Sequence, residues 1–125
     1  NNPIKTLYFK YIKKQNPYSL IAVEDLLSKF KKNIKLIEGD TNKIFHNIDL
    51  KNIDFIFIDG GHDYKTVKND LEYSYKIINK NGTILCDDWN LSQALGVREA
   101  IKDFSKERGI NFEIVYERFA QFNIP

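Results

Sequence analysis

The sequence predicts an α/β domain with parallel central strands, and three observations lead to this prediction. Residues 53–58 consist mainly of large apolar residues, with no polar residue from Phe55 to Ile58, which is typical of a strand covered on both faces of a sheet. A second run, Thr83–Cys86, follows after a helix-length segment. A strand–helix–strand crossover makes its two strands parallel. Alternating apolar residues at 112–116 and 119–124 then predict a closing antiparallel hairpin.

The first third of the chain is less regular than the rest. Leu20, Val23, Leu27 and Phe30 recur at spacings of three and four, so we expect a helix over residues 19–32. A short strand at 34–38 and a brief helix at 43–47 follow. Within residues 1–17, Pro3 and Pro17 bracket apolar residues at helical spacing between Leu7 and Ile12, and the segment forms either a short helix or a structured insertion.

Two longer helices are predicted after the first central strand. One carries an apolar stripe, has Asp63 as its N-cap and connects the two parallel strands. The stripe consists of Tyr64, Val67, Leu71, Tyr75 and Ile78. The other helix carries apolar residues between 97 and 104 and ends at Gly109, a favoured residue at a helix C-terminus.

Composition excludes several classes of protein. The 125 residues carry a net charge of only +2, and the lysines are spread along the chain, so we expect no nucleic-acid partner. The single cysteine, Cys86, excludes an internal disulfide and favours a reducing compartment. No apolar run approaches membrane-spanning length and no signal peptide is visible, so we expect a cytoplasmic protein without a membrane partner. The length allows one domain over residues 1–125.

Polar residues follow directly after both central strands. Asp59 and His62 come after the first strand, and Asp87 and Asp88 come after the second. Ligands of open α/β sheets bind just beyond the carboxyl ends of the strands. We therefore expect these four side chains to converge at one edge of the sheet.

The convergent residues have two interpretations. Three crowded carboxylates repel one another, and a hard cation such as Mg²⁺, Ca²⁺ or Mn²⁺ would remove that cost. His62 would then be the general base, because imidazole titrates near neutral pH. Alternatively, the acids simply cap the helices that follow the strands. Gly60 and Gly61 predict a tight turn that a ligand can approach, and Asp40 is a candidate to bind a ligand's hydroxyl or amine.

These motifs resemble a known family. Residues 58–64 (IDGGHDY), residues 79–89 (NKNGTILCDDW) and residues 96–101 (GVREAI) look like class I S-adenosylmethionine-dependent methyltransferases. The branch that they resemble is that of the metal-dependent O-methyltransferases related to macrocin O-methyltransferase. The resemblance runs from about residue 19 to the C-terminus.

The resemblance implies roles for individual residues. Asp59, Asp87 and Asp88 would bind Mg²⁺ or another divalent cation, and His62 would act as the catalytic base. Cofactor binding would involve Asp40 and Thr41 at the adenosine, together with Asp59 and Gly60. The cofactor would be S-adenosylmethionine.

The resemblance also implies a Rossmann-like sheet in the order 3-2-1-4-5-7-6. This chain has no counterpart of the family's first two strands or of its glycine-rich cofactor loop. We therefore expect the chain to be the C-terminal portion of a methyltransferase domain, with residues 1–17 as an insertion or a leading segment. An unpaired sheet edge favours association, so a homo-oligomer is a further expectation.

The expected function is Mg²⁺-dependent O-methylation of a small-molecule hydroxyl of the sugar or natural-product type. One alternative is a metal-dependent hydrolase that uses the same Asp/His cluster to activate water. The other alternative is a non-catalytic domain that keeps the methyltransferase fold.

Overall fold

The computed structural model describes residues 19–125, and the chain divides into two compact units, residues 1–39 and residues 40–125. The expectations for residues 1–17 lie outside the described residues. The prediction of a single domain over residues 1–125 stays a prediction.

The described part of the first unit contains a short helix and one further turn. Helix α2 spans Leu20–Leu26, and the Ser19 hydroxyl caps it by accepting from the Ala22 N–H at 3.3 Å. The 3₁₀ turn η2 spans Ser28–Phe30, so the helix predicted over 19–32 is interrupted at Leu27.

The strand predicted at 34–38 is wrong, because these residues do not adopt strand structure. A strand is stabilised by hydrogen bonds to a neighbouring strand, and no described residue pairs with this segment. The alternation of apolar residues over 34–38 was therefore not sufficient for these residues to form a strand.

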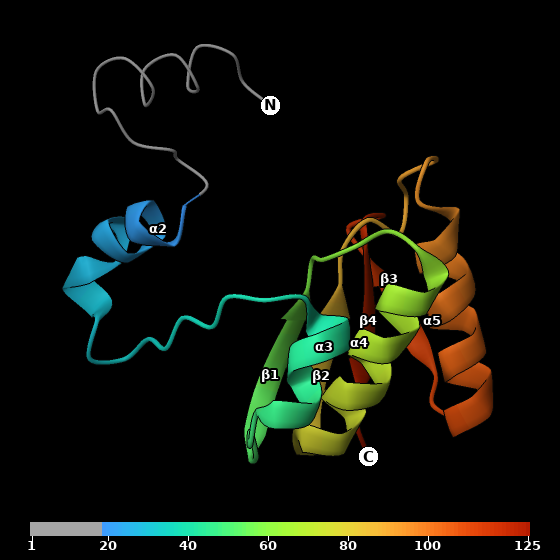
Figure 1. Ribbon diagram of the computed structural model, residues 1–125. Helices are drawn as coiled ribbons and strands as arrows, with labels where there is room; N and C mark the ends of the chain where they lie inside the picture. The colour runs from blue at the N-terminus through green and yellow to red at the C-terminus, as the bar shows by residue number, and fades with distance from the viewer. Residues whose placement is uncertain (1–18) are drawn as a thin grey trace. The chain divides into compact units, whose positions relative to one another are not determined.

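The second unit contains all the described strands (Figure 1). In chain order its elements are α3 (Thr41–Ile44), η3 (Phe45–Asn47), β1 (Ile53–Ile58), α4 (Tyr64–Ile77), β2 (Ile78–Cys86), α5 (Leu95–Arg108), β3 (Phe112–Val115) and β4 (Phe119–Asn123). The caps follow the prediction: the Asp63 carboxylate accepts from the Thr66 N–H at the start of α4, and Gly109 ends α5 with a left-handed φ of 64°.

The four strands form one mixed sheet in the order β1-β2-β4-β3. Strands β1 and β2 are parallel, whereas β4 is antiparallel to both of its neighbours, β2 and β3. This order matches the 4-5-7-6 half of the sheet that the resemblance implied. The predicted parallel pair and closing hairpin are therefore confirmed.

Strand β2 begins five residues earlier than the predicted strand, at Ile78. The pairing with β1 jumps from Ile53 opposite Ile78 to Phe55 opposite Thr83, so the intervening residues form a bulge. Asn81 lies in this bulge with a left-handed φ of 64°. The Asn81-Gly82 pair, a dipeptide typical of turns, therefore lies within the strand instead of before it.

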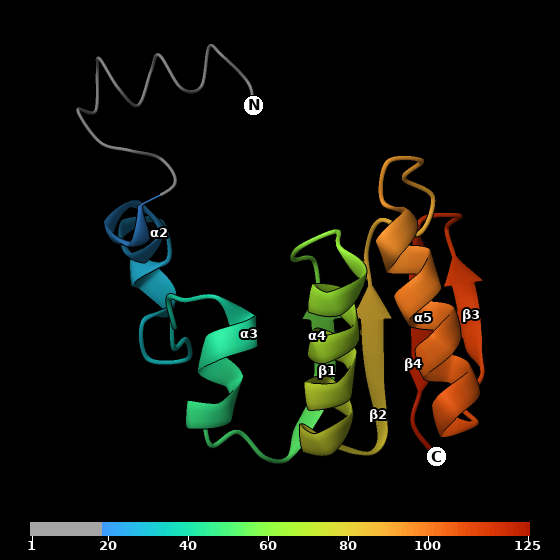
Figure 2. The same ribbon diagram turned by 45° about the vertical axis from the view of Figure 1, so that its right-hand side comes forward.

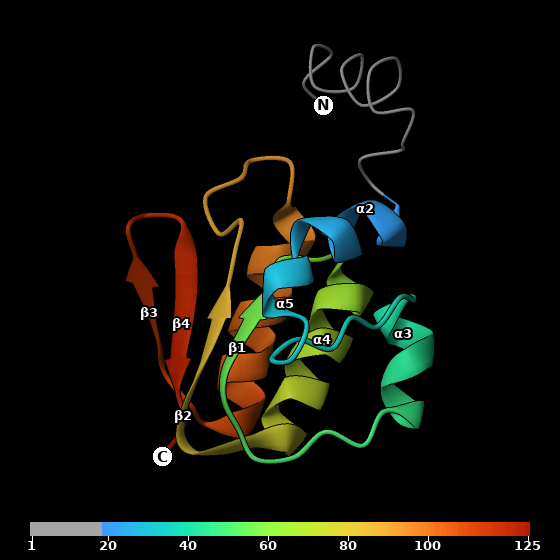
Figure 3. The ribbon, with the colours of Figure 1, turned by 90° about the vertical axis from the view of Figure 1, so that its left-hand side faces the viewer.

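Helices α4 and α5 lie side by side on the same face of the sheet (Figures 2 and 3). The core lies between these helices and the sheet. Phe104 of α5 and Phe122 of β4 are fully buried there, with their rings edge to face and their centroids 5.2 Å apart. Val67 and Leu71 from α4 and Val97 and Ile101 from α5 complete the helical side, as the apolar stripes predicted.

Strand β1 differs from the expectation that both of its faces are covered. The side chains of Phe55 and Phe57 are 57% and 48% exposed. Within residues 40–125, β1 is an edge strand, and the helices cover only the opposite face of the sheet (Figure 3). The long apolar run correctly predicted a strand but not its burial.

None of the helices among residues 19–125 combines the length and the apolar composition that crossing a bilayer requires.

Candidate functional site

The carboxyl ends of β1 and β2 lie next to each other. The Asp87 N–H donates to the Ile58 carbonyl at 2.9 Å and so continues the parallel pairing past the strand ends. A small hollow of about 10 Å³ lies at this edge, with room for no more than one water molecule. The predicted site residues that line it are Asp59, Gly60, His62, Asp87 and Asp88.

Asp88 and His62 form a pair at this edge. Their Oδ2 and Nε2 atoms are 2.8 Å apart, and the two side chains are 21% and 49% exposed. Asp88 has a left-handed φ of 62°, and its N–H donates to Asp87 Oδ1 at 2.6 Å. A carboxylate only accepts hydrogen bonds, so the contact places the proton of a neutral His62 on Nε2. Its Nδ1 is then left as an acceptor.

Asp87 is held by Arg118, a residue for which sequence reasoning gave no role. Arg118 Nε donates to Asp87 Oδ1 at 2.5 Å, and Nη2 of the same guanidinium donates to Oδ2. The Asp87 side chain is only 3% exposed. The hydrogen bonds from Arg118 hold the pKa of the Asp87 carboxyl below its usual range. The signal that could have found Arg118 is its place in the hairpin turn, because an antiparallel β4 beside β2 returns that turn to the site edge.

The turn between β3 and β4 fixes Arg118 through its main chain as well. Tyr116 and Glu117 both have left-handed φ angles, 52° and 58°. The Arg118 N–H donates to the Val115 carbonyl at 3.2 Å, and the Arg118 carbonyl accepts from the Trp89 N–H at 2.9 Å. The turn is thereby joined to the segment that follows β2.

The carboxylates at this edge do not fit a Mg²⁺ ion in the arrangement observed. Both oxygens of Asp87 accept from Arg118, and Asp88 faces His62. Among residues 19–125, no group of three or more His, Cys, Asp or Glu side chains is arranged to hold a metal ion. The Mg²⁺ site of Asp59, Asp87 and Asp88 therefore stays a prediction without support from the structure.

Asp40 and Thr41 lie at the start of α3. The Asp40 carboxylate caps this helix by accepting from the Asn42 N–H at 3.0 Å, and it lies 3.3 Å from Lys43 Nζ. The backbone hydrogen bond from Asn42 is the main reason why the pKa of Asp40 is lowered. Asn42 Nδ2 also donates to Thr66 Oγ1 at 3.0 Å, which joins α3 to α4.

Asp70 connects these residues to the glycine turn after β1. Its side chain on α4 lies in the core-facing stripe next to Leu71, and the residue is 5% exposed. Burial raises the pKa of its carboxyl, while a hydrogen bond from the Thr41 side chain opposes the shift. A Cβ at Gly60 would lie 3.3 Å from Asp70 Oδ2. Sequence reasoning missed Asp70, although an acid within an apolar helical stripe was the available signal.

One oxygen of Asp70 gives a reason to associate this region with a cofactor. Oδ1 is buried and has no hydrogen-bond partner among the described residues. A buried acceptor of this kind suits a ligand that brings N–H or O–H donors. S-adenosylmethionine carries an ammonium group and ribose hydroxyls, so Asp70, Thr41 and Gly60 fit that cofactor.

Helix α5 fixes the loop that carries His62. A Cβ at Gly96 would lie 2.5 Å from the Tyr64 N atom and 2.7 Å from the His62 carbonyl oxygen. Contacts this short leave no room for a side chain. The first turn of α5 therefore packs directly on the loop backbone at His62.

Cys86 ends β2 beside the site but has no chemical role there. The residue is 1% exposed, and burial raises the pKa of its thiol to about 12. A protonated thiol is a poor nucleophile. Cys86 is therefore part of the core and not a nucleophile.

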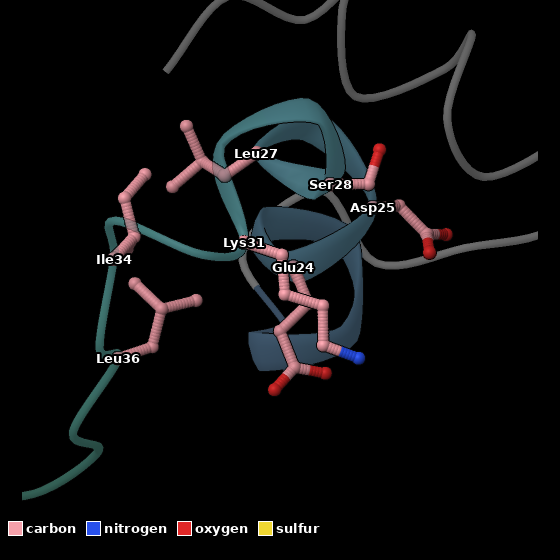
Figure 4. A pocket seen from close by; sticks show the side chains of 7 residues that line it. All are labelled: Glu24, Asp25, Leu27, Ser28, Lys31, Ile34 and Leu36. Carbon is pink, nitrogen blue, oxygen red and sulfur yellow. The ribbon is translucent and has the colours of Figure 1, made fainter.

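A separate hollow of about 390 Å³ lies within the first unit (Figure 4). Leu27, Ile34 and Leu36 form its apolar side, and Glu24 and Lys31 line it as well. None of the predicted site residues lines this hollow.

Comparison with known families gives one match over most of the chain. Residues 9–89 match a family model described as a methyltransferase domain. Protein R132 of Acanthamoeba polyphaga mimivirus, which is described as uncharacterized, is 51% identical over 37 residues. That stretch covers 30% of this chain and 17% of the viral protein.

Solved structures show the same fold. The O-methyltransferase NovP matches with a TM-score of 0.70 and 11% identity over 85% of this chain. CalS11, described as a TDP-rhamnose 3′-O-methyltransferase of calicheamicin biosynthesis, matches with a TM-score of 0.65 and 14% identity over 82% of this chain. Aeropyrum pernix fibrillarin with bound S-adenosylmethionine matches with a TM-score of 0.53 and 16% identity over 84% of this chain. The chain spans about half of each, namely 45%, 51% and 51% of their lengths.

Proposed function

The chain belongs to the methyltransferase-domain family, and we propose that the full-length protein transfers the methyl group of S-adenosylmethionine to a hydroxyl of a small molecule. The observation that carries the proposal is the His62–Asp88 pair at the strand ends. It provides a half-exposed imidazole with one nitrogen fixed by a carboxylate and the other available to a substrate. The fold shared with the O-methyltransferases NovP and CalS11 supports a hydroxyl acceptor.

Several residues would hold the cofactor. Asp70 of α4, Thr41 at the start of α3 and Gly60 after β1 fit it, and Asp40 and Asp59 precede Thr41 and Gly60 in sequence. When bound, S-adenosylmethionine supplies an electrophilic methyl group on a sulfonium. The chain's own task is to orient the acceptor and to remove its proton.

His62 performs the proton transfer. Its Nδ1 accepts the proton of the substrate hydroxyl, and Nε2–H remains bonded to Asp88 Oδ2 at 2.8 Å. The carboxylate fixes the ring orientation and stabilises the imidazolium that forms, because opposite charges at this distance attract strongly. No step is assigned to a metal, because Asp87 is already engaged by Arg118.

Substitution of the base tests this function. His62→Ala should lower kcat for methyl transfer by about 10²–10⁴-fold, because a general base contributes roughly that factor. Asp88→Asn should lower kcat less, since the base remains but loses its oriented, charged partner. Product would be measured from radiolabelled S-adenosylmethionine with a panel of nucleotide-linked deoxysugars and phenols as acceptors.

Asp49→Asn is the matched control, because Asp49 forms an exposed ion pair with Lys51 away from the described site. Its rate should equal that of the wild type. A fully active His62→Ala protein would disprove the role of His62. A folded wild-type protein that neither binds the demethylated cofactor nor transfers methyl groups would disprove the function itself.

A further inference from the structure

We propose that Arg118 supplies the positive charge at Asp87 that the family resemblance assigns to a divalent cation, so that this site works without a bound metal. The proposal rests on the proposed function. It gives Arg118 a positioning role in the same site and makes metal dependence a separate, measurable property.

Arg118 contacts Asp87 through both oxygens of the carboxylate. Nε and Nη2 donate to the two different oxygens of one carboxylate, which is the bidentate arrangement that planar guanidinium and carboxylate groups favour. With the Asp87 side chain only 3% exposed, a cation would have to displace Arg118 to reach it. Removing Arg118 without a replacement would leave a buried, uncompensated charge, which is strongly unfavourable.

Two of the three carboxylates at this edge already have side-chain partners. Arg118 neutralises Asp87, and His62 faces Asp88 at 2.8 Å. The positive charge of Arg118 also acts on Asp59 and Asp88. The repulsion between carboxylates, which was the physical reason to expect a metal ion, is therefore reduced by side chains.

The hairpin turn holds the main chain of Arg118 in place. Its carbonyl accepts from the Trp89 N–H at 2.9 Å, so the turn is bonded to the segment that carries Asp87 and Asp88. The guanidinium also lies over the Phe119 ring, 5.2 Å from its centroid. A side chain fixed in this way loses little further entropy by remaining at Asp87.

Arg118 reaches the base through two intermediate residues, Asp87 and Asp88. It fixes the Asp87 carboxylate, whose Oδ1 accepts from the Asp88 N–H at 2.6 Å. That bond supports the left-handed backbone of Asp88, with its φ of 62°, and the Asp88 side chain meets His62. Arg118 is therefore a positioning residue for His62.

Binding of Mn²⁺, followed by electron paramagnetic resonance on the full-length protein, tests the proposal. The wild type should show no saturable site that depends on Asp87. Arg118→Ala should gain at least a roughly tenfold affinity for Mn²⁺, because Asp87, Asp88 and Asp59 lose their fixed counter-charge. The double variant Arg118→Ala/Asp87→Asn should lose that gain.

Arg108→Ala is the matched control, because Arg108 also pairs with an acid, Glu72, but on α5 and α4. It should bind Mn²⁺ like the wild type. If Arg118→Ala does not fold, as judged by circular dichroism, Arg118→Gln replaces it with the same expectation. Tight, saturable Mn²⁺ binding by the wild type that Asp87→Asn abolishes would overturn the proposal.

An activity measurement adds a second readout. Wild-type methyl transfer should be unchanged by EDTA, whereas Arg118→Ala should have a lower kcat that Arg118→Lys only partly restores, because lysine cannot form the bidentate contact. Loss of wild-type turnover in EDTA, with recovery on adding Mg²⁺, would also overturn the proposal. The Mn²⁺ measurement does not depend on methyl transfer, so failure of the proposed function would be recognised separately.

Discussion

Asp70 shows how one buried charge can indicate a binding region. Its carboxyl is 5% exposed, and Oδ1 has no hydrogen-bond partner among the described residues. Burial raises the pKa of the Asp70 carboxyl in the folded protein. The folded protein therefore holds this proton more tightly than the unfolded chain does. As the pH rises above the pKa that Asp70 has in the unfolded chain, its charged form lowers the stability of the folded protein.

Asp70→Asn should stabilise the ligand-free protein at pH 7 by about 1 kcal/mol, because it removes a buried charge that is incompletely hydrogen-bonded. The gain should shrink as pH falls toward 4 and below, where Asp70 itself is protonated. Urea unfolding at several pH values measures it. Destabilisation at neutral pH would mean that Oδ1 also has a donor within the protein, in addition to the Thr41 side chain that bonds this carboxylate.

The side chains that meet at the site were only partly predictable from the sequence. Asp59, His62, Asp87 and Asp88 could be placed at one edge because each follows a strand of a predictable parallel pair. The place of Arg118 in the hairpin turn indicated this edge of the sheet, but its contact with Asp87 could not be assigned, because that contact joins residues far apart in sequence and depends on a side-chain conformation. For the same reason the sequence did not reveal that a guanidinium contacts Asp87, one of the three residues predicted to bind a metal ion.

At the scale of elements, the β3–β4 hairpin is important because it carries Arg118. Its turn contains two consecutive left-handed residues, Tyr116 and Glu117. This is the pattern of a type I′ turn, in which Asn-Gly is the favoured pair. Neither residue of this turn is one of those favoured types, so the hairpin retains local backbone strain.

Glu117→Gly should raise the free energy of unfolding by about 1 kcal/mol, because glycine adopts a left-handed conformation without the usual steric cost. The Arg118–Asp87 contact does not involve the Glu117 side chain, so kcat should be unchanged. Chemical denaturation and steady-state kinetics check the two expectations. A loss of stability would show that the Glu117 side chain makes a stabilising contact that outweighs the backbone strain.

Element boundaries were predicted best where a cap agreed with an apolar stripe. Helix α4 begins after Asp63 and α5 ends at Gly109, as expected. The segment 34–38 failed because a strand needs a partner, which no local pattern can supply. The exposure of Phe55 and Phe57 has a similar origin, since burial of β1 depends on what covers the edge and the face of the sheet.

At the scale of the whole molecule, the sheet order β1-β2-β4-β3 brings the site residues together. The parallel crossover aligns the ends of β1 and β2, and the antiparallel β4 returns the Arg118 turn to the same edge. This topology was predictable from the sequence because the crossover and the hairpin have clear local signals. The family match and the shared fold of NovP and CalS11 agree with it.

The most direct test of the central claim is calorimetric titration of S-adenosylhomocysteine into the full-length protein, in EDTA and in Mg²⁺. Our account predicts saturable binding of one molecule per chain, with the same affinity in both buffers. This measurement requires no knowledge of the methyl acceptor. Absence of binding by the folded protein in either buffer would contradict the assignment of this site to methyl transfer.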